Sequence, residues 1–148
     1  MGAGSAEADR ATAAAGVIVC ATTAREPLFD GALVRDDAVV IAVGSHEPDA
    51  RELPSDLLSR AAVVVEDVAT ALRECGDVVL AVGEGAITAT DLVPMADVVT
   101  GRVSLRADRP VVFKSSGMSW EDLVVATAVA DQGADGEGPP RDPRERRA

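Results

Sequence analysis

The sequence lacks the residues from which nucleic-acid-binding surfaces are built. Its 148 residues include two Phe, one Trp and no Tyr, and these rings are scattered at Phe29, Phe113 and Trp120. A base-stacking platform or an aromatic sugar groove needs several rings on one surface, so neither is expected. Basic residues are also outnumbered, with 14 Lys and Arg against 25 Asp and Glu and a formal net charge of -11. Because such a surface repels phosphate, nucleic acid and anionic membranes are excluded as partners.

Cysteine, histidine and long apolar runs are scarce as well. Cys20 and Cys75 each lie in an apolar stretch outside any CxxC pair, which predicts buried structural thiols in a reducing compartment. His46 is the only histidine and no zinc spacing is present, so no metal site is expected. Residues 1–16 have no apolar core of a signal peptide, and no run approaches the roughly 20 residues that span a bilayer. We expect a cytoplasmic protein without a membrane partner.

Short β-branched runs indicate the fold class. They are Val17 to Cys20, Val39 to Val43 and Ala62 to Val65, with a further candidate strand at Val111 to Phe113. The first three runs are apolar on both faces, a pattern typical of parallel strands buried between two layers. The connections between them are long enough for the crossovers of a dozen or more residues that parallel pairing needs. The sequence therefore predicts an α/β fold.

Helix signals occupy the connections and the two ends. Acids open a candidate helix at Glu66 to Cys75, and Gly76 is expected to end it in the left-handed conformation. Ser119 and Asp122 resemble a capping box for a helix that runs to about Ala130. Further expected elements are a loose helix within residues 1–16, a short helix at Pro54 to Arg60, and a disordered tail over residues 132–148.

The turns after the first two strands are the strongest candidates for a site, because ligands bind beyond the carboxyl ends of parallel strands. These turns are Cys20 to Pro27 and Val43 to Leu53. Their small and hydroxyl-bearing residues would let a flat ligand approach the backbone, although helix capping alone also selects such residues. His46 is a candidate general acid or base, or a solvated loop residue. Lys114, the only lysine, reads as a surface residue or as a functional group, and Glu84 is another candidate carboxylate.

Several segments taken in order resemble the ornithine cyclodeaminase and mu-crystallin family. They are Val17 to Thr23 with Arg25 to Pro27, Ala42 to Ser45 with Pro48-Asp49 and Arg51 to Leu53, Glu84 to Ile87, Thr100 to Arg102, and Val112 to Gly117 with Glu121 to Leu123. The resemblance runs from about Ala6 to Ala130. It is specific, because five motifs in the right order and spacing are much harder to meet by chance than a single turn.

The resemblance implies an NAD(P)-dependent enzyme that acts on an amino acid or a cyclic imine. By this resemblance, Thr22 and Ser115 match family residues that lie near the cofactor. The run Val40, Ile41, Ala42 and Val43 matches the family segment on the nicotinamide side of the cofactor. His46 stands where the cyclodeaminases carry a catalytic aspartate. This difference favours imine reduction or an amino-acid dehydrogenase over ornithine deamination.

The family pattern also implies that part of the domain is missing. No Gly-rich phosphate turn follows a strand in this sequence. We therefore expect an incomplete Rossmann-like parallel sheet that lacks the first βαβ unit, with residues 17–131 as a partial NAD(P)-binding domain that is inactive alone. A homodimer, or pairing with a missing half, is the expected assembly. A wrong start, a decayed gene or a separate second chain would each explain the pattern, and a non-catalytic interaction module or an inactive remnant is the alternative function.

Overall fold

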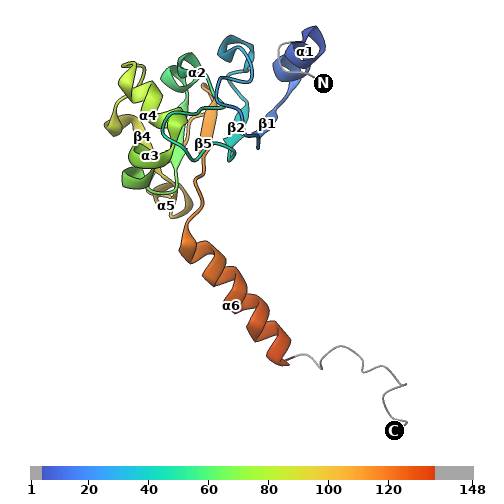
Figure 1. The fold of residues 1–148 in the computed structure, drawn as a ribbon, viewed down its shortest axis with the longest axis vertical. Coiled ribbons are helices and arrows are strands. Elements are labelled where there is room, and N and C mark those ends of the chain that lie inside the picture. Colours follow the sequence, from blue (N-terminus) through green and yellow to red (C-terminus); the bar gives the residue numbers. More distant parts are fainter. Residues whose placement is uncertain (1–4, 136–148) are drawn as a thin grey trace, which may run out of the picture. The chain divides into compact units, whose positions relative to one another are not determined.

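A single parallel sheet forms the core of the larger of two compact units. The computed structural model describes residues 5–135, which fall into two compact units, one up to Ser116 and one from Gly117 onward. The first unit holds the sheet, whose strands lie in the order β1-β2-β5-β3-β4 (Figure 1). The strands are β1 (Val17–Cys20), β2 (Val39–Ala42), β3 (Ala62–Val65), β4 (Leu92–Pro94) and β5 (Val111–Lys114). All neighbouring strands are parallel, which confirms the predicted α/β class and its four expected strands.

The strands end level with one another at one edge of the sheet. Cys20 at the end of β1 is in register with Ala42 at the end of β2, and Ala42 is in register with Lys114 of β5. Lys114 is in turn in register with Val65 of β3. Because the pairing is parallel, the segments that follow these four strands all leave the sheet at this edge.

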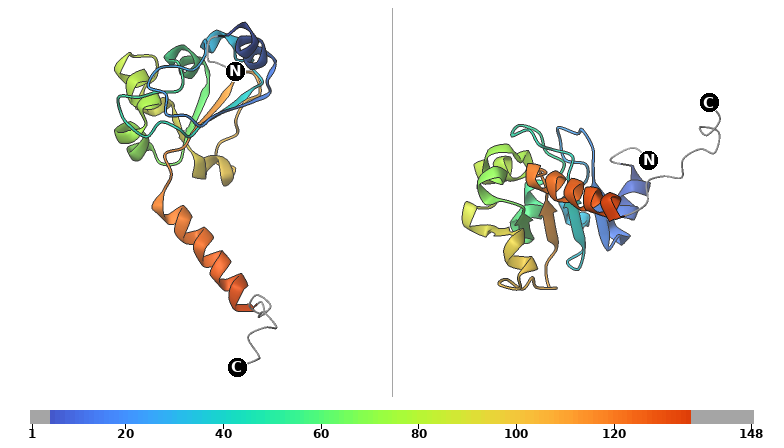
Figure 2. Two further views of the ribbon diagram at one scale, coloured as in Figure 1. Left: turned by 45° about the vertical axis from the view of Figure 1, so that its right-hand side comes forward. Right: turned by 90° about the horizontal axis from the view of Figure 1, so that it is seen from below.

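Three helices cover one face of the sheet. They are α2 (Ser55–Arg60), α3 (Val68–Glu74) and α4 (Gly76–Gly83), and Figure 2 shows them together on one side of the strands. Leu57 and Leu58 of α2 and Val78 of α4 are at most 1% exposed and pack with Val40 and Val112 of the sheet. Two short 3-10 turns, η1 (Gly31–Leu33) and η2 (Ala89–Asp91), complete the connections. The predicted short helix at Pro54 to Arg60 is thus confirmed.

The opposite face departs from the expectation of strands buried between two layers. β3 is buried along its whole length, but Val17 and Val19 of β1 are 62% and 63% exposed. Val39 of β2 is 36% exposed. Within residues 5–116 nothing encloses these side chains, so only half of the apolar pattern of β1 and β2 is satisfied by this unit. Helix α5 (Met95–Val99) does not cover these side chains. It borders an apolar hollow together with Val64 of β3 and Phe113 of β5.

The sequence predicts that Gly76 ends a helix in the left-handed conformation, and this prediction is wrong. Helix α3 ends at the cap Cys75, and Gly76 is the first residue of α4 with a negative φ. A Cβ atom at this position would overlap the backbone carbonyl oxygens of Ala50 and Glu47. Glycine is therefore needed here for the close approach of two backbones. Strand β4 was not predicted, since it has only three residues and ends in a proline.

A helix lies near each end of the described residues. Helix α1 (Ala6–Ala14) lies within the predicted segment 1–16, and the Ser5 hydroxyl accepts from the Ala8 N–H at 3.2 Å. Helix α6 (Ser119–Asp135) begins with Ser119 inside the helix, and the Glu121 carboxylate accepts from the Met118 N–H at 3.2 Å. The predicted cap at Ser119 is therefore misplaced by one residue. α6 also continues four residues into the predicted tail, and residues 136–148 lie outside the described part.

The apolar side chains of α6 are largely exposed to solvent. Leu123 and Val129 are 67% and 65% exposed. Among the helices of residues 5–135, none combines the length and apolar character needed to cross a bilayer.

Candidate functional site

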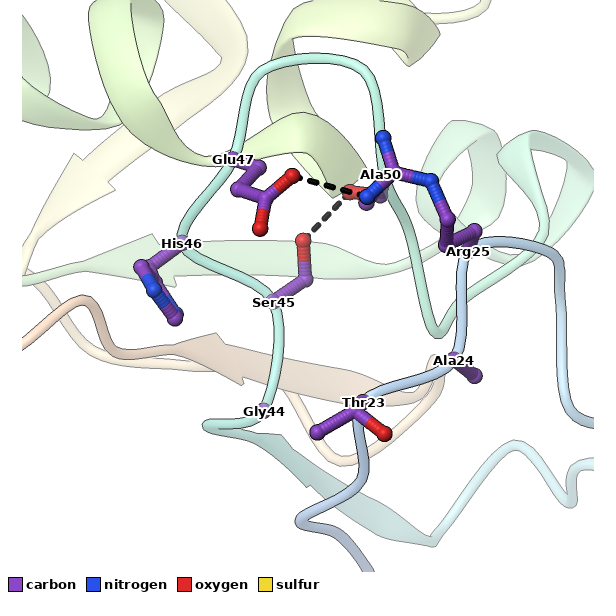
Figure 3. A pocket seen from close by; sticks show the side chains of 8 residues that line it. All are labelled: Thr23, Ala24, Arg25, Gly44, Ser45, His46, Glu47 and Ala50. Carbon is purple, nitrogen blue, oxygen red and sulfur yellow. Dashed lines mark hydrogen bonds and ion pairs between the residues drawn. The ribbon is translucent and has the colours of Figure 1, made fainter.

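The turns that follow β1 and β2 line a small pocket at the carboxyl edge of the sheet (Figure 3). The cavity has a volume of about 60 Å³. The lining residues are Thr23, Ala24 and Arg25 from the first turn, and Gly44, Ser45, His46, Glu47 and Ala50 from the second. Both turns had been predicted to carry the site, and the structure brings them together where ligands of parallel α/β folds bind.

The buried carboxylate of Glu52 binds donors from both turns. Its Oε1 accepts the backbone N–H of Thr22 at 2.7 Å and the Thr22 hydroxyl at 2.8 Å. Its Oε2 accepts the backbone N–H of Gly44 at 2.8 Å. Glu52 is 0% exposed. One side chain therefore holds donors from two separate segments, with a charge-assisted hydrogen bond at each of three points.

A second buried carboxylate, that of Asp77, holds the backbone of Glu52 in place. Oδ1 of Asp77, at the start of α4, accepts the backbone N–H groups of Glu52 and Leu53, both at 2.8 Å. Oδ2 of Asp77 has no hydrogen-bond partner and lies 3.5 Å from Nζ of Lys114. Desolvation by burial raises the pKa of Asp77, while its backbone donors and the Lys114 ammonium act in the opposite direction.

Lys114 is buried, in contrast to the surface position that its sequence context suggested. Its side chain is 1% exposed, and Nζ donates to the carbonyl oxygens of Ser45 at 2.5 Å and Ala42 at 3.3 Å. The reason is its place in β5, a strand with neighbours on both sides, where the side chain points toward the helices. Lys114 thus binds the second turn at the Ser45 carbonyl, and Glu52 binds it at the Gly44 N–H.

Little in the sequence indicates this network. Glu52 is predicted only as part of a motif, and Asp77 is not predicted as a site residue. For Asp77 the available signal was its position as a single acid between Gly76 and an apolar run. The rarity of lysine in the sequence was the signal for Lys114.

Thr22 lies beside the pocket with its hydroxyl group already oriented. Its hydrogen is directed to Glu52, and its Oγ1 also accepts the Ala24 N–H at 3.2 Å. A hydroxyl oxygen has two lone pairs, so one acceptor site remains for a ligand. The exposed side chain of Thr22 can therefore accept a further hydrogen bond but has no hydrogen left to donate.

His46 and Arg25 form exposed parts of the pocket lining. Figure 3 shows the Arg25 guanidinium reaching across to the second turn, where it pairs with Glu47 at 2.7 Å. Arg25 also pairs with Asp49 at 2.6 Å. All three charged groups are more than half exposed, so these ion pairs contribute little to stability.

The other predicted cofactor residues occupy different environments. Val40 and Ala42 are 0% exposed in the core, so their side chains position the strand. Ile41 is half-buried and Val43 is 43% exposed, and both stay predictions for the nicotinamide side. Ser115 lies at the same edge, where its N–H donates to the Ala42 carbonyl at 3.0 Å and its hydroxyl donates to Glu66 at 2.7 Å.

The candidate carboxylate Glu84 lies at the end of α4 and pairs with Arg51 at 2.8 Å. It is not among the residues that line the pocket. In residues 5–135 no group of three or more His, Cys, Asp or Glu side chains could hold a metal ion. Cys20 and Cys75 are buried free thiols, as predicted, and burial raises the pKa of Cys20 to about 12.

The pocket offers polar groups to a small ligand. Exposed polar side chains line it, and the Thr22 hydroxyl beside it can accept a hydrogen bond. Binding of a pyrophosphate needs a run of free backbone N–H groups at a helix N-terminus. In the second turn, by contrast, the Gly44 N–H is already bound to Glu52. The Gly44 N–H is therefore not available to a phosphate group.

Comparison with known proteins identifies the family of the chain. The profile of the ornithine cyclodeaminase/mu-crystallin family matches residues 3–137. The chain belongs to this family. It is 38% identical to the ketimine reductase mu-crystallin of Mus musculus over 127 residues, which are 86% of this chain and 39% of that protein. It is 36% identical to a Delta(1)-pyrroline-2-carboxylate reductase of Colwellia psychrerythraea, over 83% of this chain and 40% of that protein.

A solved structure matches the fold over most of the chain. The Delta(1)-pyrroline-2-carboxylate reductase of Thermococcus litoralis, in complex with NADH and L-proline, superposes with a TM-score of 0.82 at 30% identity. The match covers 86% of this chain and 41% of the reductase. The sheet is thus Rossmann-like, and the chain spans about two fifths of the length of these relatives.

Proposed function

We propose that the chain is the nicotinamide-side part of an NAD(P)H-dependent reductase of cyclic imines. The observation that carries this proposal is the two-turn pocket, in a chain that superposes with a TM-score of 0.82 on a reductase bound to NADH and L-proline. The relatives act on ketimines and pyrroline-2-carboxylate by name, which supports a small cyclic imine as the substrate class. NAD and NADP are both compatible with the described residues.

Imine reduction requires a hydride at the carbon and a proton at the nitrogen of the C=N bond. A bound NAD(P)H supplies the hydride. The protein has to orient the ring, place the imine against it and provide the proton. In this proposal Thr22 accepts a hydrogen bond from the ring substituent, and the exposed His46 holds the proton for the nitrogen. Ser45, whose hydroxyl donates to the Ala50 carbonyl, keeps the backbone beside His46 in place.

Replacement of His46 by Asn tests this function, in protein purified from its cell of origin. We expect oxidation of NADH or NADPH, followed at 340 nm, with pyrroline-2-carboxylate, and no release of ammonia from ornithine in the presence of NAD. His46→Asn should lower turnover by about 100-fold or more, because general acid catalysis contributes about 10²–10⁴. The control is Glu84→Gln, at an exposed carboxylate outside the pocket lining, which should keep turnover within a few-fold. Turnover of ornithine without turnover of the imine would contradict the proposal.

Self-association is the second candidate role, and it is supported by the exposed apolar face of β1. Val17 and Val19 lie on this face and are 62% and 63% exposed. We propose that a second copy of the chain covers them in a homodimer, because large apolar patches on soluble proteins mark interaction sites. A strictly monomeric species in sedimentation at high protein concentration would contradict this role.

A further inference from the structure

The Glu52 carboxylate links two separate connections of the chain, which neither a helix cap nor a buried ion pair has to do. Its carboxylate lies between the turns after β1 and β2 and binds three donors, the N–H and hydroxyl of Thr22 and the N–H of Gly44. Thr22 and Gly44 belong to different βα connections, so local chain geometry alone does not fix their separation. Both turns contribute residues to the pocket.

The position of the Glu52 carboxylate is itself fixed. Its backbone N–H is held by Asp77, and Asp77 lies 3.5 Å from Lys114. Lys114 also donates to the Ser45 carbonyl in the second turn. The side chain of Glu52 is 0% exposed, so water does not replace its partners. The carboxylate is therefore a rigid reference point for both turns.

From this geometry we infer that Glu52 is a positioning residue that sets the width of the pocket and makes Thr22 an acceptor of ligand hydrogen bonds. The hydroxyl hydrogen of Thr22 is committed to Glu52, and one lone pair of Oγ1 remains free. A ligand group that meets Thr22 must then be a donor. This selects a carboxamide, which has an NH₂ group, over a carboxylate, which has only acceptors. The selectivity deepens the proposed function and rests on it, whereas the positioning role does not.

The ligand-free arm of the test measures amide hydrogen exchange by NMR. Glu52→Gln places an NH₂ group where one carboxylate oxygen accepted, so the amides of Thr22 and Gly44 should exchange about tenfold faster or more. The core amide of Val64 should keep its protection. Glu47→Gln, a substitution at an exposed carboxylate of the same pocket, is the control and should change neither amide.

Wild-type protein gives a second readout that does not depend on folding of the variant. The carboxyl carbon of Glu52 should show scalar couplings across the hydrogen bonds to the amide nitrogens of Thr22 and Gly44. Wild-type exchange rates at both amides in Glu52→Gln would overturn the positioning role. Absence of both couplings in wild-type protein would overturn it as well.

The ligand arm compares NADH with its analogue that carries a carboxylate in place of the carboxamide. Wild-type protein should bind NADH about tenfold more tightly or better, one well-made hydrogen bond being worth roughly that factor. Thr22→Val should lose this preference with the exchange pattern of Gly44 retained. Equal affinity of the wild type for both compounds would overturn the selectivity. Failure to bind either compound overturns the proposed function and the selectivity with it, while the exchange data still decide the positioning role.

Discussion

Replacing Lys114 with Met lowers the free energy of unfolding by about 3–5 kcal/mol, the usual cost of removing one partner from a buried ion pair. Met fills a similar volume, so the loss comes from charge and hydrogen bonding and not from a cavity. Asp77 Oδ2, which has no hydrogen-bond partner, lies 3.5 Å from Nζ and loses its only nearby cation within the described residues. The carbonyl oxygen of Ser45 loses its donor at the same time. Chemical denaturation at pH 7 measures the change.

The pH dependence of this loss identifies Asp77 as its source. Burial already raises the pKa of Asp77 in the folded protein above its unfolded value. Protonation of such a group favours folding, so its stabilising contribution is present at low pH and is lost as pH rises through the folded pKa. Lys114→Met removes a group that opposes this shift, so the deficit should be largest near neutral pH and should shrink in acid.

Two further variants control the Lys114 result. Asp77→Asn retains an acceptor for the two backbone N–H groups and removes the charge, so in the Lys114→Met background it should recover part of the lost stability. Arg106→Met removes an ion pair whose arginine is 75% exposed, and we expect no measurable change. Loss of the same small size in Lys114→Met and Arg106→Met would contradict the account.

Gly44→Ala should lower the free energy of unfolding by about 3 kcal/mol, the upper end of the usual cost of overpacking. A Cβ at Gly44 would overlap the backbone oxygen and nitrogen of Thr22 and would lie 2.5 Å from Oε1 of Glu52. Two of these neighbours are backbone atoms, and the third is held by the buried network, so none can move cheaply. The two turns must then separate, and the amides of Thr22 and Gly44 should lose protection together.

Gly83→Ala is the matched control for Gly44→Ala. Gly83 is the last residue of α4, has a negative φ, and an added Cβ would meet no atom within 4 Å. Alanine is preferred over glycine in helices by roughly 0.5–1 kcal/mol, so this variant should be slightly more stable. Thermal or denaturant unfolding compares the two variants directly. If Gly44→Ala were as stable as wild type, the close packing of the two turns would be wrong.

The framework of the fold could be predicted because its signals are local. The β-branched runs at Val17, Val39 and Ala62 have the composition of buried parallel strands, and all three form strands of the sheet. The rule that ligands bind at the carboxyl ends of such strands then located the two turns of the pocket. Strand β4 escaped because three residues that end in a proline carry no periodicity.

The buried network could not be predicted because it depends on contacts between distant parts of the chain. Asp77 reaches the backbone of Glu52 from another helix, and Lys114 reaches Ser45 from another strand. Taken one at a time, these residues look like ordinary acids and a surface lysine. At Gly76 the sequence predicts a left-handed helix stop, but glycine is required there because the Ala50 carbonyl packs against it.

Saturation-transfer NMR with NADH tests the central claim, that the pocket between the two turns receives the nicotinamide end of the cofactor. Protons of the nicotinamide ring should gain more saturation from the protein than those of adenine. Ala24→Leu, which fills the pocket, should abolish this signal, whereas Ala21→Leu, at an exposed position of the same turn outside the pocket lining, should retain it. Stronger saturation of adenine, or an unchanged nicotinamide signal in Ala24→Leu, would contradict the account.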